Sequence, residues 1–111
     1  MKKVTLTCAH AIVKYLIAQK ILIDGKKEPL FPGVFGIFGH GNVACLGQAL
    51  EENQKDLPTY RGHHEQNMAL TGIGYARGKR RQQIFIATSS VGPGATNMVT
   101  AAAVAMSNRL P

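Results

Sequence analysis

Hydrophobic residues recur at helical spacing near the start of the chain. The positions on this apolar face are Ala9, Ile12, Val13, Leu16 and Ile17. Thr7 precedes them and has a side chain suited to a helix N-cap, because its oxygen can accept a free backbone N–H of the first turn. The pattern therefore predicts a helix that begins after Thr7 and fades near residues 19–22. Residues 24–29 are polar and contain Gly and Pro, which predicts a turn.

Three segments further along have the character of strands. Residues 34–38 are a short apolar run that fits a buried strand, and residues 82–87 are the clearest strand candidate. Residues 59–61 are a weaker candidate. Each segment is followed by a helical pattern, so strands and helices alternate along the chain.

The helices expected between and after these strands have recognisable starts. Asn42 is a candidate N-cap for a helix over residues 43–50, a second helix begins at Glu65, and the last spans residues 95–108. The order is one helix and then three strand–helix pairs. That alternation predicts an α/β fold, a parallel sheet with crossover helices on both faces.

The whole chain, residues 1–111, is expected to form part of one domain. Its length suits one modest domain, and no linker or internal repeat divides it. Each earlier helix leads into a strand, but the last one leads only to Leu110 and Pro111. We therefore expect the polypeptide to be a piece of a longer protein, or the sheet to be incomplete.

Composition and charge narrow the function classes. The chain is 45% hydrophobic and 17% charged, and its formal net charge is +7. A positive charge allows attraction to anions. However, the densest basic run, residues 78–81, falls at a predicted helix end, where cations complement the helix dipole. The basic residues lack interleaved aromatic residues, so we expect no nucleic-acid partner.

The cysteines and the apolar segments bear on location. Cys8 and Cys45 form no C-x-x-C pair, which favours reduced thiols and a cytoplasmic protein. No segment is long and apolar enough to span a membrane, so we expect no membrane partner.

Glu65 is the main candidate for chemistry. It is the last acidic residue of the chain, and it enters a helix directly after a predicted strand. The carboxyl edge of a parallel sheet is where open α/β folds bind ligands. A glutamate in the first turn of a helix also commonly complements the helix dipole, so position alone favours that simpler role.

Two glycine-bearing loops are expected at the same edge as Glu65. They follow the strands at residues 34–38 and 82–87. Their candidate ligand-lining residues are Gly39, His40, Gly41, Asn42, Gly92, Pro93, Gly94 and Asn97. Glycines let a ligand approach the backbone, although each loop alone is explained by a tight turn. Two such loops with a carboxylate favour a ligand cleft.

Three other apparent motifs in the chain do not match the sites that they imitate. Residues 72–78 imitate a dinucleotide fingerprint but follow helical sequence, so their glycines are expected to permit close helix packing. Residues 88–92 imitate a nucleophile elbow without its first glycine or its downstream partners. The spacing of His40, His63 and His64 matches no zinc site, and we expect no metal ligands in this chain. Of the two adjacent histidines, we expect one to face solvent and one to line the cleft.

Two segments together resemble a known family. Residues 62–69, followed by residues 74–77, resemble the segment of thiamine-diphosphate enzymes that carries their activating glutamate. Residues 88–97 are similar to the second signature of the pyrimidine-binding domain of these enzymes. The resemblance extends from about Thr7 to the last residue, and it implies an incomplete thiamine-diphosphate-binding fold.

The resemblance implies thiamine diphosphate as cofactor and a specific role for Glu65. In the family, this carboxyl hydrogen-bonds a ring nitrogen of the cofactor's aminopyrimidine and so promotes removal of the thiazolium proton. Both glycine-bearing loops would line the pyrimidine pocket, and Thr88 and Ser89 would face the reacting centre and the substrate. Burial in a water-poor cleft is expected to raise the pKa of Glu65.

The branch of the family is suggested by two local features. The long connection at residues 24–33 and the segment at residues 36–44 are similar to the inositol-catabolism hydrolases that open a cyclic dione by C–C cleavage. The alternatives are another thiamine-diphosphate enzyme, such as an acetolactate synthase, and a non-catalytic basic binding module.

The family also implies partners that this chain lacks. The Gly-Asp-Gly signature, through which a separate domain binds the diphosphate and its Mg²⁺, is absent. Family active sites lie between subunits, which implies a homodimer or tetramer. We therefore expect this polypeptide alone to be inactive and to bind the cofactor weakly or not at all.

Overall fold

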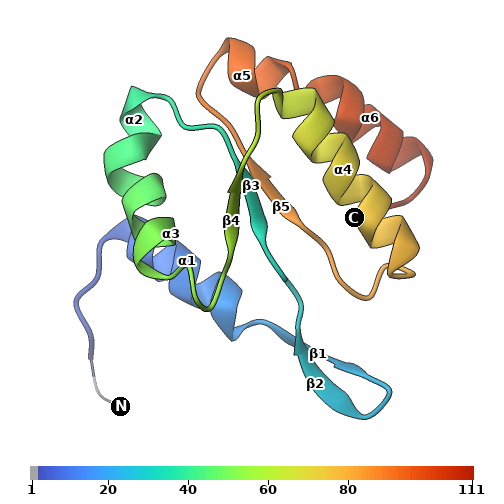
Figure 1. Cartoon of the computed structure of the whole chain (residues 1–111), viewed down its shortest axis with the longest axis horizontal. Helices are drawn as coiled ribbons and strands as arrows, with labels where there is room; N and C mark the ends of the chain where they lie inside the picture. Colours follow the sequence, from blue (N-terminus) through green and yellow to red (C-terminus); the bar gives the residue numbers. More distant parts are fainter. Residues whose placement is uncertain (1–2) are drawn as a thin grey trace.

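Three short parallel strands form the centre of the computed structural model, which describes residues 3–111 (Figure 1). They are β3 (Val34–Gly36), β4 (Thr59–Arg61) and β5 (Ile86–Thr88), and their order in the sheet is β4-β3-β5. The central strand β3 pairs in parallel with both neighbours over its whole length. The predicted α/β class with a parallel sheet is confirmed.

One layer of helices covers the first face of this sheet. Its elements are α1 (Cys8–Ala18), α2 (His40–Asn42), the π-helix η1 (Val43–Gly47) and α3 (Gln48–Glu52). The predicted cap of α1 is confirmed, because the side chain of Thr7 accepts the backbone N–H of His10. The helix after β3 differs from expectation at its start. It begins at His40 with Gly39 as N-cap, so the prediction that Asn42 caps it was wrong.

A second layer covers the opposite face. It consists of α4 (Glu65–Gly78), α5 (Pro93–Thr96) and α6 (Val99–Ser107), and α4 packs against α6, β3 and β5. The predicted start of α4 at Glu65 is confirmed. The single helix expected over residues 95–108 is instead two helices with a break at residues 97–98. Helices on both faces of the sheet are thus confirmed (Figure 1).

A β-hairpin replaces the fading helix and polar turn expected at residues 19–29. It pairs β1 (Lys20–Ile23) with β2 (Lys26–Pro29) in antiparallel register. The two loop residues, Asp24 and Gly25, have φ values of 49° and 78°. Positive φ at both positions gives the tight two-residue turn that matches strand twist, and Asp-Gly is a favoured pair for it.

The strand predicted at residues 82–87 is displaced towards the C-terminus. Pairing begins only at Ile86, which lies opposite Val34, the first residue of β3. The preceding segment is held by other contacts: Gln83 is buried, and its side-chain amide donates to the Pro29 carbonyl at 2.8 Å.

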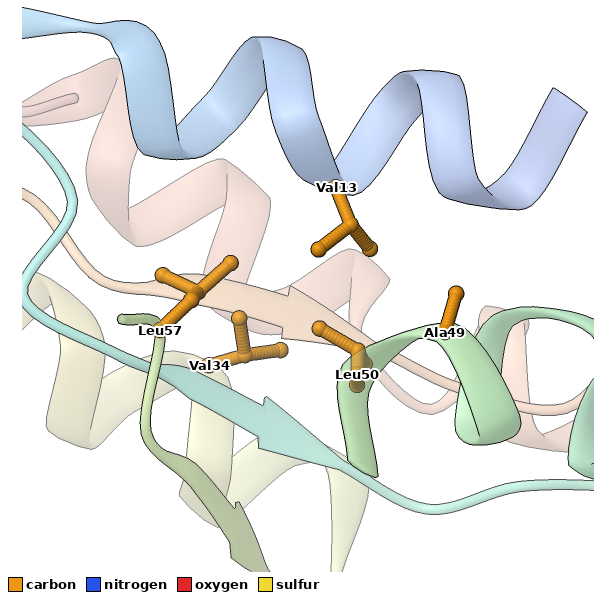
Figure 2. Packing of buried hydrophobic residues seen from close by; sticks show 5 residues of the cluster. All are labelled: Val13, Val34, Ala49, Leu50 and Leu57. Carbon is orange, nitrogen blue, oxygen red and sulfur yellow. The ribbon is translucent and has the colours of Figure 1, made fainter. Parts of the chain in front are cut away.

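The buried core lies between the first helical layer and β3. Figure 2 shows side chains from α1, β3 and α3, together with Leu57 from the loop before β4, converging on one another. The five members are Val13, Val34, Ala49, Leu50 and Leu57, and each is at most 2% exposed. Burial of such aliphatic side chains contributes about 1.5–3 kcal/mol each.

Aromatic rings fill the other side of the sheet. Phe35 follows Val34 on β3 and so points to the opposite face. Its ring stacks on Phe85 at 4.8 Å between centroids, and Tyr75 of α4 meets Phe85 edge-on at 4.8 Å. Gly72 lets α4 approach, since a Cβ there would lie 3.4 Å from Phe85 Cβ. This close packing is the role predicted for the glycines of residues 72–78, but only Gly72 has it, because a Cβ at Gly74 or Gly78 would meet nothing within 4 Å.

Within the described residues, no helix has both the length and the apolar character needed to cross a membrane.

Candidate functional site

Three helix starts meet at the carboxyl edge of the parallel sheet. Each strand leads into a helix at this edge: β3 into α2, β4 into α4, and β5 into α5 (Figure 1). Parallel strands make this convergence unavoidable, because all their carboxyl ends point the same way. The predicted loops and Glu65 therefore lie at one end of the molecule.

Glu65 is held at this edge by contacts from both directions. It is the first residue of α4, whose N-cap is His64, with His64 Nδ1 accepting the backbone N–H of Asn67 at 3.3 Å. The Glu65 carboxylate oxygen Oε2 accepts a hydrogen bond of 2.8 Å from the Asn97 side-chain amide. Its other oxygen, Oε1, faces Gly94, since a Cβ built there would lie 3.1 Å away. The carboxylate thus points into the loop between β5 and α6.

The pKa of Glu65 is lowered below its ordinary value of 4.5, contrary to the expectation that burial would raise it. The largest cause is the hydrogen bond donated by Asn97, followed by a backbone N–H of Glu65 itself. Burial acts in the opposite direction, and the nearby His64 adds a small lowering effect. The hydrogen bonds favour the charged form more than this open edge disfavours it. In this chain Glu65 is therefore ionised at neutral pH.

The loop after β3 forms a pocket with the loop after β5. Its volume is about 440 Å³, and its lining residues are Gly39, His40, Gly41, Asn42, Ser90 and Val91. The Asn42 side-chain amide donates to the Ser89 carbonyl at 3.2 Å, which ties the two loops together. Asn42 thus acts as a cross-link between loops instead of the predicted helix cap.

The remaining predicted site residues fall into two groups. Gly92, Pro93, Gly94 and Asn97 do not line the pocket of residues 39–42, and two of them, Gly94 and Asn97, lie beside the Glu65 carboxylate. The second group, Thr88 and Ser89, is half-buried. The Thr88 carbonyl accepts the Ile37 N–H at 3.1 Å, and the Ser89 hydroxyl donates to the Ser90 carbonyl at 3.0 Å. The edge therefore has a glycine-walled pocket and a carboxylate, joined at Ser90.

Ser90 is the residue that the sequence reasoning missed. A Cβ at Gly39 would lie 2.8 Å from Ser90 Cβ, and a Cβ at Gly94 would collide with Ser90 Oγ. Gly39, in the loop after β3, and Gly94, in α5, therefore both pack against the Ser90 side chain. The sequence shows only adjacent serines after a strand, and nothing in that pattern distinguishes Ser90 from Ser89.

Two adjacent histidines lie next to Glu65 in the chain. His63 and His64 are both exposed and neither lines the pocket of residues 39–42, so the cleft-lining role expected for one of them stays a prediction. His64 uses its ring to cap α4. Across residues 3–111, no group of three or more His, Cys, Asp or Glu side chains is placed to hold a metal ion.

The basic run at the end of α4 has a structural use. Arg81 Nε donates to the Arg109 carbonyl at 3.0 Å, and its terminal nitrogen donates to the Asn108 carbonyl at 3.4 Å. These carbonyls follow the end of α6, where backbone acceptors lack helical partners. Arg81 thus joins the ends of α4 and α6.

Comparison with protein families decides the identity of this edge. The family model described as "Thiamine pyrophosphate enzyme, N-terminal TPP binding domain" matches residues 7–111. The chain belongs to this family.

Curated relatives match the chain of this thiamine pyrophosphate enzyme domain over its full length. The 3D-(3,5/4)-trihydroxycyclohexane-1,2-dione hydrolase of Geobacillus thermodenitrificans is 53% identical over 111 residues, and that of Clostridium tetani is 50% identical. The Bacillus thuringiensis hydrolase of the same name is also 50% identical. Each alignment covers 100% of this chain and 17% of the relative, so the chain spans about a sixth of their length. No solved structure matches the chain significantly.

The family implies thiamine diphosphate, and the residues at this edge fit the aminopyrimidine end of that cofactor. Because Gly94 has no side chain, the Glu65 carboxylate and the Ser90 side chain both come close to its backbone, where a Cβ would collide with Ser90 Oγ and lie 3.1 Å from Glu65 Oε1. Asn97 fixes the carboxylate through one oxygen, while the other oxygen faces Gly94. An oriented carboxylate beside bare backbone suits a planar ring that carries hydrogen-bonding nitrogens.

Proposed function

We propose that this chain is the N-terminal, pyrimidine-binding part of a thiamine-diphosphate-dependent hydrolase. Its substrate would be trihydroxycyclohexane-1,2-dione, cleaved at a C–C bond in inositol catabolism. The observation that carries the proposal is the Glu65 carboxylate, fixed by Asn97 at 2.8 Å on the edge where both glycine-bearing loops meet. The substrate class comes from relatives that are 50–53% identical along the whole chain and carry that name.

Glu65 would form a hydrogen bond with the aminopyrimidine ring and exchange a proton with it. When bound, thiamine diphosphate supplies the nucleophilic carbon and the electron sink that C–C cleavage requires. The lowered pKa in the isolated chain gives a carboxylate ready to accept a hydrogen bond. Closure of the edge by the rest of the enzyme would remove water and raise that pKa towards the range useful for proton transfer.

The other residues at the edge would position these groups. Asn97 sets the direction of the Glu65 carboxylate, and the lack of a side chain at Gly94 lets Glu65 and Ser90 approach the backbone there. The pocket formed with Gly39, His40, Gly41 and Asn42 would lie beside the ring. Gly92 and Pro93 begin the turn into α5, with Gly92 at a φ of 72° that favours glycine.

Binding of the diphosphate and its metal, and completion of the active site, would depend on parts outside this chain. A separate diphosphate-binding domain would hold the Mg²⁺ and the diphosphate. A second subunit would complete the site, giving a homodimer or tetramer in the cytoplasm.

Glu65→Gln in a full-length enzyme that carries this domain tests the proposal. Glutamine keeps the size of the side chain but cannot exchange the proton, so turnover should fall by about 10²–10⁴-fold. Glu51→Gln, on the exposed surface of α3, is the matched control and should leave turnover within about twofold. Unchanged turnover in a folded Glu65→Gln enzyme would reject the proposed role.

A further inference from the structure

We propose that Ser90 contacts the substrate of this site, and that its hydroxyl binds a hydroxyl group of a cyclic polyol seated in the pocket of residues 39–42. This inference rests on the proposed function, which supplies the substrate class. Within that function, Ser90 would be the residue of this chain that hydrogen-bonds the hydroxyl groups of the substrate.

The position of Ser90 is set by two glycines on different loops. Ser90 Cβ would lie 2.8 Å from a Cβ at Gly39, and Ser90 Oγ occupies space that a Cβ at Gly94 would need. The same point above Gly94 is 3.1 Å from Glu65 Oε1. The Ser90 hydroxyl is therefore a neighbour of the Glu65 carboxylate and also a wall of the pocket. A ligand in that pocket would contact Ser90, which is also a neighbour of the Glu65 carboxylate.

The Ser90 hydroxyl makes no hydrogen bond within the described part of the chain. The neighbouring Ser89 hydroxyl donates to a backbone carbonyl at 3.0 Å, whereas the Ser90 hydroxyl has no partner among residues 3–111. Ser90 is half-buried and is one of the residues that line the pocket, so water or a ligand must satisfy its hydroxyl. A hydroxyl offers one donor and two acceptor sites, which matches the alcohol groups of a polyol.

The pocket has the size and the walls for such a ligand. Its volume of about 440 Å³ falls within the usual range for small-molecule sites, which is about 300–1,000 Å³. Gly41 leaves the backbone of one wall open to close approach, since a Cβ there would meet nothing within 4 Å. His40, exposed on the same wall, adds ring nitrogens that can donate or accept. A six-membered ring with several hydroxyls can thus be bonded from both walls.

An NMR titration of the 111-residue chain with myo-inositol tests this inference. In a ¹⁵N-labelled sample, the amide signals of Ser90, Gly39 and Gly41 should shift in a saturable manner. Cyclohexanone, a ring of the same size without hydroxyl groups, should not cause these shifts. The same spectra report whether each variant remains folded.

Variants at Ser90 decide whether the hydroxyl is responsible. Ser90→Ala, and Ser90→Cys as a variant of similar shape with a weak donor, should each weaken myo-inositol binding at least tenfold. Ser107→Ala, on the exposed end of α6, should leave it unchanged. The inference is overturned if the three signals do not shift, or if the Ser90 variants bind as well as the parent chain.

The outcome can be separated from that of the proposed function. Glu65→Gln should leave myo-inositol binding within about twofold, because Glu65 faces Gly94 and does not line the pocket. Loss of turnover in Glu65→Gln without any polyol binding would reject only the role of Ser90. Polyol binding through Ser90 with normal turnover in Glu65→Gln would reject only the role of Glu65.

Discussion

The core under β3 and the carboxyl edge of the same sheet are built from opposite kinds of residue. The core consists of aliphatic side chains such as Val13, Leu50 and Leu57, sealed from water. The edge consists of glycines and half-buried polar groups, with Glu65 and Asn97 bonded to each other. In the core, the volume of each side chain matters most. At the edge, the directions in which a few polar atoms point matter most, so the two regions should respond differently to equally small substitutions.

The largest expected effect on folding comes from the core. Leu50→Ala removes a side chain that is 2% exposed and should lower the free energy of unfolding by about 2–5 kcal/mol. Leu22→Ala, at a side chain that is 72% exposed, should change it by less than about 0.5 kcal/mol. Urea denaturation followed by circular dichroism measures both. Equal losses from the two variants would mean that the cluster in Figure 2 does not carry the stability.

The edge should lose function while folding is retained. An added methyl in Gly94→Ala collides with Ser90 Oγ and lies 3.1 Å from Glu65 Oε1, so both side chains must shift. Moving them should lower turnover of a full-length enzyme by about 100-fold, because catalysis depends on their placement. Gly74→Ala, where a Cβ meets nothing within 4 Å, is the control on α4. It should keep activity and add about 0.5–1 kcal/mol of stability. Normal activity in Gly94→Ala would show that catalysis does not depend on the placement of Ser90 and Glu65.

A smaller effect is expected from the bond that orients Glu65. Asn97→Ala removes the main cause of the lowered pKa of Glu65, so that pKa should rise. A carboxyl with a lowered folded-state pKa stabilises the fold above the pKa of the unfolded chain, and this stability is lost as pH falls through the folded-state pKa. The variant should therefore lose less stability on acidification than the parent chain.

Titration of the Glu65 carboxyl by ¹³C NMR measures this shift. Asn108→Ala removes an amide that donates to the Val104 carbonyl at the end of α6, so it should leave the pKa of Glu65 unchanged. Turnover of a full-length Asn97→Ala enzyme should fall by about 10- to 100-fold through misplacement of the carboxylate. An unchanged pKa in Asn97→Ala would contradict the hydrogen bond seen here.

The sequence predicts elements well where local chemistry and tertiary packing agree. Thr7 caps α1 as expected, and α4 begins at Glu65 after a strand. The hairpin of residues 20–29 was missed because its apolar residues also continue the spacing of α1. Its Asp24-Gly25 turn was the informative signal, since both residues adopt positive φ.

Tertiary contacts explain the other misses. Asn42 has a side chain that can cap a helix, but its amide donates to the Ser89 carbonyl of a distant loop instead. The pairing of β5 begins opposite the first residue of β3, which local apolarity at residues 82–87 does not reveal. At the site, residue types and order predict a shared edge for Glu65 and the two loops. They do not predict the partner of Glu65 or its lowered pKa, because both depend on the position of Asn97, 32 residues away.

Hydrogen–deuterium exchange at the thiazolium carbon of bound thiamine diphosphate tests the central claim most directly. It should be measured in a full-length enzyme carrying this domain, with and without Glu65→Gln, after confirming that both forms bind the cofactor. If the Glu65 carboxylate acts on the aminopyrimidine, exchange should slow by at least about 100-fold in the variant. Equal exchange rates in the two cofactor-loaded forms would contradict the account.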